Sequence, residues 1–120
     1  MNREAAAEFI VTMLNSRTSA HILHLKTRSY AEHKALEEFY EGVTPLTDRL
    51  AENLQGKYGI LDYMDCPLET PSEGRALMQS LTTYVDSMRG YLEETSDVQN
   101  IVDEIVDLIA RTNYKLNFLS

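Results

Sequence analysis

The stretch LEEFYEGVTPLTDRLAENL, residues 36–54, decides the fold class. Its apolar residues return every three or four positions, which is the period of an amphipathic α-helix and not of a strand. They are Leu36, Phe39, Val43, Leu46, Leu50 and Leu54. We therefore predict one long helix over residues 31–56. Gly42 and Pro45 lie inside it, and an interior proline removes a backbone hydrogen bond, so we also predict a kink or a short break there.

Three further segments carry the same helical period, at residues 3–27, 71–92 and 97–118. Residues 57–70 between the second and third helices break it, and they are long enough to run back along a bundle. Four amphipathic helices with one long connection predict an all-α fold. The expected architecture is a four-helix bundle with a crossover connection between its second and third helices.

Two local signals mark where the last two helices should start. Thr70, Pro71 and Glu73 combine an N-cap residue, a first-turn proline and the acidic partner of a capping box. Ser96 and Gln99 form a similar pair at the fourth helix. We expect a capping box at each position.

Length and composition indicate one globular domain spanning residues 1–120. The net charge of −8 opposes binding to nucleic acid or to anionic membranes, because both would repel the chain. The single cysteine, Cys66, fits a reducing compartment, and the N-terminus lacks a signal-peptide pattern. We expect a cytoplasmic protein, of a bacterium or a phage-infected host, without a membrane span.

Histidines and carboxylates with helical spacing form the candidate metal site. His33 follows His21 by 12 residues, Asp48 follows His33 by 15, and Glu52 follows Asp48 by 4. His24, the remaining histidine, lies one helical turn after His21. Imidazole together with carboxylate suits zinc or iron, whereas carboxylates alone would suit magnesium or calcium.

The predicted ligands on the second helix share a face that points away from the apolar stripe. At about 100° per residue, His33, Glu37, Glu41, Asp48 and Glu52 fall within an arc of about 100°. Such ligands cannot meet in the core of one bundle. Two copies packed antiparallel across a two-fold axis would bring His33 of one copy near Asp48 and Glu52 of the other. We therefore predict a homo-oligomer, either a dimer or a larger closed assembly.

Two segments resemble the Dps-type miniferritins. They are AHILHLKTRSYAEHKALEEFYEGVTPLTDRLAE (20–52) and DVQNIVDEIVDLIARTNYKLNFLS (97–120). Among ferritin-like proteins, these segments look most similar to short phage-encoded members. In that family two histidines on either side of a basic turn are followed by an aspartate and a glutamate on the second helix. The matching residues are His21, His33, Asp48 and Glu52.

The position of the first family histidine stays open. The family usually has a tryptophan after it and a longer turn, whereas Ile22 follows His21. Aligning His24 instead, with a shortened turn, places Leu25 at the tryptophan position and Arg28 at the basic one. Either histidine is therefore a candidate for the first ligand.

The resemblance implies that the four-helix bundle with its crossover connection is ferritin-like. It also implies an iron site between subunits that oxidises Fe²⁺ to Fe³⁺ and sequesters iron. Zinc is the alternative metal, because the same donors bind it. Glu37 and Glu41, on the ligand face, would relay or store ions. The chain lacks the lysine-rich tail of typical members, so the resemblance does not imply DNA compaction.

Two other functions fit parts of the sequence. A ferritin-like scaffold that has lost its metal would act as a non-enzymatic acidic interaction protein, for example a virion accessory. Paired acidic residues on helices also occur in all-α magnesium-dependent nucleotide pyrophosphatases. Here the local pairs are Glu38 with Glu41, and Glu104 with Asp107, with no basic cluster beside them for phosphate.

Overall fold

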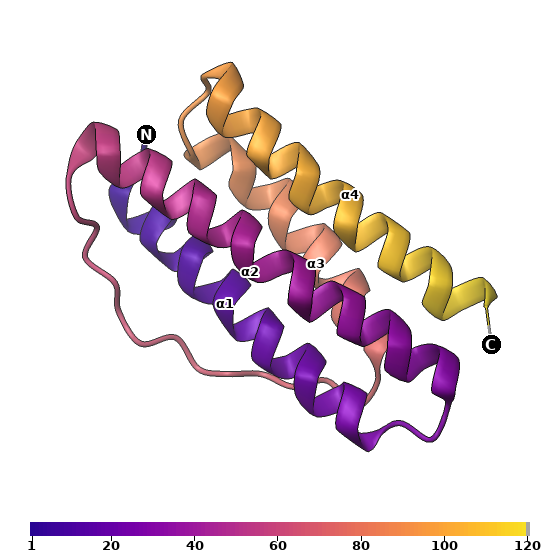
Figure 1. Cartoon of the computed structure of the whole chain (residues 1–120). Helices are drawn as coiled ribbons and strands as arrows, with labels where there is room; N and C mark the ends of the chain where they lie inside the picture. The colour runs from indigo at the N-terminus through magenta and orange to yellow at the C-terminus, as the bar shows by residue number, and fades with distance from the viewer. Residues whose placement is uncertain (120) are drawn as a thin grey trace.

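A computed structural model describes residues 1–119, and helices account for most of them (Figure 1). They are α1 (Arg3–Lys26), α2 (Tyr30–Tyr58), α3 (Gly74–Met88) and α4 (Ser96–Phe118), with a short 3₁₀-helix η1 (Arg89–Tyr91) after α3. No strand occurs among the residues that the structure describes. The prediction of an all-α fold with four helices is confirmed.

The helices form a bundle in which each helix packs on two antiparallel neighbours. Both α1 and α4 pack against α2 and α3. Figure 1 shows that α2 and α3 run in the same direction, opposite to α1 and α4. Since α2 and α3 are consecutive and parallel, the chain between them must return along the length of the bundle.

The connection over residues 59–73 makes this return beside α1. Gly59 ends α2 with a φ of 85°, a left-handed conformation that glycine adopts without steric cost. Asn15 of α1 donates a hydrogen bond to the carbonyl of Cys66 at 3.2 Å, and Ser19 donates to the carbonyl of Glu69 at 3.0 Å. These side-chain donors hold a segment that has no regular structure of its own.

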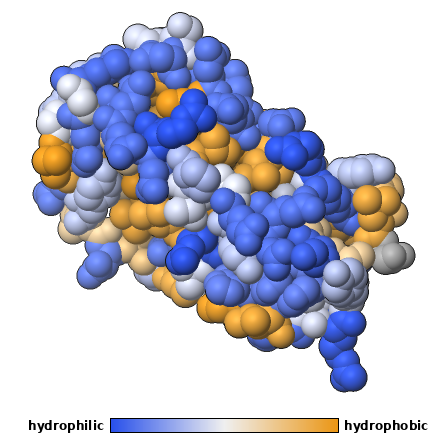
Figure 2. Space-filling view, viewed as in Figure 1, coloured by the Kyte–Doolittle hydropathy of each residue, from blue (hydrophilic) through white to orange (hydrophobic). Residues whose placement is uncertain are grey.

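The core consists mainly of the apolar stripes that the helical period predicts. On α2, the stripe residues Leu36, Phe39, Val43, Leu50 and Leu54 are fully buried, and Leu46 is partly buried. Full burial of one such side chain is worth about 1.5–3 kcal/mol relative to leaving it exposed. Figure 2 shows hydrophilic side chains over most of the visible face, with smaller hydrophobic patches along the edge where the connection runs, in the middle of the face and near its C-terminal end. No described helix is apolar enough over a sufficient length to cross a membrane.

Pro45 does not interrupt α2. The helix is continuous from Tyr30 to Tyr58, so the short break, one of the two predicted alternatives, is wrong. The predicted kink near Pro45 stays a prediction. Thr44 and Thr47, on either side of the proline, donate hydroxyl hydrogen bonds to the carbonyls of Tyr40 and Val43. Burial of the stripe on both sides outweighs the lost backbone hydrogen bond.

Neither predicted capping box forms. The third helix starts at Gly74, and its N-cap residue, Glu73, makes no side-chain capping hydrogen bond. The Thr70 hydroxyl instead faces that of Ser19 on α1. Similarly, the N-cap of α4 is Thr95, and Gln99 donates to the carbonyls of residues 89 and 93. Contacts with neighbouring segments replace the local hydrogen bonds that the sequence favours.

Candidate metal centre

The tight turn between α1 and α2 brings the histidines together. Helix α1 ends at Lys26, and α2 begins at Tyr30 with Ser29 as its N-cap, whose hydroxyl accepts a hydrogen bond from the Glu32 amide at 3.3 Å. Only three residues therefore separate the helices. The last turn of α1 must then face the first turns of α2.

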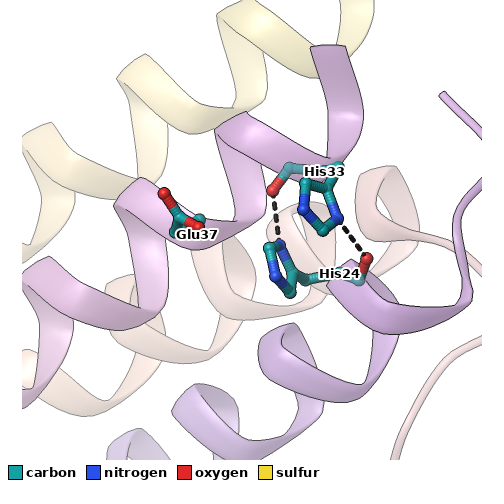
Figure 3. Close-up of side chains that lie close together, drawn as sticks. All are labelled: His24, His33 and Glu37. Atoms are coloured by element: carbon teal, nitrogen blue, oxygen red, sulfur yellow. Dashed lines mark hydrogen bonds between the residues drawn. The ribbon is translucent and has the colours of Figure 1, made fainter. Parts of the chain in front are cut away.

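His24 and His33 form a reciprocal pair across this turn (Figure 3). The Nδ1 atom of His24 lies 2.6 Å from the carbonyl oxygen of His33, and Nδ1 of His33 lies 2.8 Å from the carbonyl oxygen of His24. The rings stack with their centroids 3.6 Å apart. A carbonyl oxygen only accepts hydrogen bonds, so each Nδ1 carries the proton. In the neutral rings each Nε2 then keeps a free lone pair.

Glu37, one turn after His33 on α2, completes a cluster of three donors. One ligand atom from each of His24, His33 and Glu37 lies within 4.8 Å of the other two. It is the one such group of three or more among residues 1–119. Lys34 donates to the Glu37 carboxylate at 2.8 Å, and this hydrogen bond lowers the pKa of that carboxyl. The cluster thus offers two neutral nitrogens and one anionic oxygen.

The third histidine, His21, lies beside this cluster but outside it. Its ring stacks on Tyr40 with the centroids 4.4 Å apart, and it is 5.8 Å from the ring of His24. The edge of Tyr40 meets His24 at a centroid distance of 5.3 Å. Burial raises the pKa of the Tyr40 hydroxyl. Tyr40 therefore contacts both His21 and His24 and forms one aromatic side of the cluster.

The predicted carboxylate ligands lie far from the histidines within one chain. Asp48 and Glu52 are both exposed on α2. Asp48 follows His33 by 15 residues on a continuous helix, which corresponds to about 22 Å at about 1.5 Å per residue. Neither carboxylate forms an ion pair with another described residue. Their convergence with the histidines across two copies stays a prediction.

The sequence interpretation included His24 and His33 but did not assign Glu37 as a ligand. The signal was present, because Glu37 follows His33 by four residues and therefore lies on the same face one turn further. The 12-residue spacing between His21 and His33 favoured His21 as the first ligand instead. Within the chain it is His24, not His21, that contacts His33.

Three of the four carboxylates that suggested a nucleotide pyrophosphatase form ion pairs at separate places. Glu38 pairs with Lys115, Glu104 with Arg49 at 3.1 Å, and Asp107 with Arg111 at 2.9 Å. None of these carboxylates belongs to a metal-binding group of three among residues 1–119. The geometry therefore offers little for a magnesium site of that kind.

A cavity of about 370 Å³ lies between α1, α3 and the connection. Its polar groups are largely used within the chain: Ser16 donates to the carbonyl of Met13, Ser19 to that of Glu69, and Tyr84 to Glu8. Burial raises the pKa of the Tyr84 hydroxyl, which keeps it protonated. Because most of its polar groups are already hydrogen-bonded within the chain, this cavity is a weaker candidate for a functional site than the histidine cluster.

Comparison with known proteins places the chain in a family. The profile of DUF5856, described as a family of unknown function, matches residues 24–116. The chain belongs to this family. The matched region contains His24, His33 and Glu37.

A phage protein is similar to the DUF5856 chain over almost its full length. It is an uncharacterized 14.6 kDa protein from the mobD-ri intergenic region of Enterobacteria phage T4. The two are 23% identical over 114 residues, which cover 93% of this chain and 88% of the phage protein. No solved structure matches the chain. The predicted relation to phage proteins is thus supported by this relative.

Proposed function

We propose that this protein binds a divalent transition-metal ion at the turn between α1 and α2, through His24, His33 and Glu37. The observation that carries the proposal is the convergence of their three ligand atoms to within 4.8 Å of one another. Zinc and iron both accept such a set of two imidazoles and one carboxylate. Three protein ligands leave coordination positions for water, a substrate or a group from another subunit.

The hydrogen bonds of the histidine pair favour metal binding. A metal-ligating histidine usually donates its other ring N–H to a carbonyl or carboxylate, which fixes the tautomer and the orientation of the ring. His24 and His33 already make such bonds to backbone carbonyls. The stacked rings must tilt for both nitrogens to reach one ion at about 2.0–2.1 Å.

The resemblance to miniferritins supports iron as the physiological metal. One long connection between the second and third helices is also the arrangement of ferritin-like bundles. In this proposal two copies pack through α2, and Asp48 and Glu52 of one copy complete the coordination at His24 and His33 of the other. Two Fe²⁺ ions bound as substrate at such sites would each give one electron to one hydrogen peroxide, which would take up two protons and form two waters, leaving two Fe³⁺ ions. The site then acts in iron oxidation and sequestration.

Metal titration of the purified protein tests the proposal. Binding of Co²⁺, as a coloured substitute for Zn²⁺ and Fe²⁺, is followed by visible absorbance and calorimetry. His24→Ala and His33→Ala should each lose tight binding, and Glu37→Gln should weaken it. The matched control is Glu41→Gln, which removes an exposed carboxylate one turn further along α2. Binding that survives both histidine changes would refute the site.

The same titration separates the two forms of the proposal. If His21→Ala and Asp48→Asn leave binding intact, the ion is held by His24, His33 and Glu37 within one chain. If Asp48→Asn abolishes binding and the protein is a dimer in light scattering, a second copy contributes. Fe²⁺ oxidation no faster than in buffer, with metal retained, would assign a structural zinc in place of iron oxidation.

A further inference from the structure

Lys34 is the charged neighbour of the proposed site. Its ammonium lies 2.8 Å from the Glu37 carboxylate, three residues along the same helix. The Lys34 side chain is 46% exposed and that of Glu37 is 28% exposed. The lysine is therefore at the rim of the cluster, and its flexible stem can turn to solvent without any change in the fold.

The Glu37 carboxylate is the one anion among the three donors, because the two histidines ligate as neutral rings. Without metal, its charge is balanced by Lys34. A divalent ion at ligand distance from Glu37 would lie only a few ångströms from the ammonium. Two cations would then share one carboxylate, and their repulsion at that distance is strong, even when partly screened by water.

We propose that Lys34 is a built-in competitor for Glu37, which weakens metal binding at the site and restricts it to ions able to displace the ammonium. This inference rests on the proposed function, since it concerns the same site. Ions that bind imidazole strongly, such as Zn²⁺, displace the ammonium because His24 and His33 supply most of the affinity. Mg²⁺ and Ca²⁺, which depend on carboxylate oxygen, do not. Lys34 thus acts as a selectivity residue.

Zinc affinity of three variants, measured by calorimetry, tests the inference. Lys34→Gln removes the charge but keeps an N–H donor for Glu37, and should tighten zinc binding by about tenfold. Lys34→Arg keeps the charge and should bind like wild type. The matched control is Lys57→Gln, which removes another ion-paired lysine from the opposite end of α2 and changes the net charge equally. It should leave the affinity unchanged.

Three results would overturn the inference. Weaker binding by Lys34→Gln would show that the lysine positions the carboxylate instead of competing for it. Equal tightening by Lys34→Gln and Lys57→Gln would assign the effect to overall charge. An unchanged affinity would show no competition. In a Glu37→Gln background, the effect of Lys34→Gln should disappear, which overall charge does not predict.

Failure of the inference is distinguishable from failure of the proposed function. If wild type binds zinc and His33→Ala does not, the site exists whatever Lys34→Gln does. If neither wild type nor Lys34→Gln binds zinc, both the site and the role of Lys34 are refuted.

Discussion

The two ends of the bundle carry polar clusters of opposite character. At the hairpin end, where α1 turns into α2, His24 and His33 pair through hydrogen bonds to each other's backbone carbonyls beside Glu37. At the opposite end, which we call the loop end, Lys57 donates to Glu93 at 2.9 Å and to Asp97 at 2.7 Å. His33 lies near the start of α2 and Lys57 near its finish, and Figure 1 shows the two ends of α2 at opposite ends of the bundle.

At the loop end, the charged groups are paired with one another within the chain. Its cation is shared by two carboxylates, and Tyr58 adds a hydroxyl hydrogen bond to Glu93. The hydrogen bond from Lys57 is the main reason that the pKa of Asp97 is strongly lowered. The hairpin end instead keeps unused nitrogen lone pairs. The comparison indicates that the loop end holds helices together, whereas the hairpin end has capacity left for a ligand.

Metal-dependent stabilisation should distinguish the ends most strongly. A ligand that binds only the folded state raises the free energy of unfolding by about 2.7 kcal/mol at about 100 times its dissociation constant. We expect this gain in zinc for wild type and for Lys57→Met, and its loss in His33→Ala. Chemical unfolding with and without zinc measures it. A gain that persists in His33→Ala would place the metal elsewhere and break the comparison.

The histidine pair should contribute modestly to the metal-free fold. His33→Ala removes one hydrogen bond to a backbone carbonyl, which is worth about 0.5–1.5 kcal/mol. Leu50→Ala, at a fully buried core position, should cost about 2–5 kcal/mol. Urea unfolding of both metal-free variants gives the two values. If His33→Ala is as costly as Leu50→Ala, the pair is primarily structural.

Acid should weaken the loop end. Because the pKa values of Asp97 and Glu93 are lowered in the folded state, their stabilisation is complete above their ordinary values, near pH 4, and is lost as the pH falls through the folded values. Thermal unfolding from pH 7 to about pH 2 should show a smaller acid loss in Lys57→Met than in wild type. Arg111→Met, which breaks the Asp107 pair within α4, is the control and should keep the wild-type slope.

Removal of one lysine at each end should give the smallest difference in stability, but it compares the two ends most directly. Without metal, Lys57→Gln should lower the unfolding temperature. The ammonium of Lys57 links α2 to Glu93 and Asp97, which lie in later segments of the chain. Lys34→Gln breaks only an exposed pair within one helix, and should change stability less. Differential scanning fluorimetry compares the two. A larger loss in Lys34→Gln would contradict the division between the ends.

Much of the fold was predictable because helix periodicity is local. The ends of α2 at Tyr30 and Tyr58 lie within two residues of the predicted 31–56, since one apolar stripe runs through the whole segment. The start of α3 was not predictable from its capping signal. Thr70 meets Ser19 on α1 instead of capping a helix, and a contact between segments 51 residues apart has no local signature.

The sequence by itself determined the helices and the supply of ligand types, because both follow from residues close together in the chain. It placed His24, His33 and Glu37 near one turn. Only the tertiary structure decided that His24, and not His21, meets His33 within the chain. That choice depends on the rotation of α1 against α2 after a three-residue turn. The rotation is set by which apolar faces of both helices pack into the core, a property of the whole bundle.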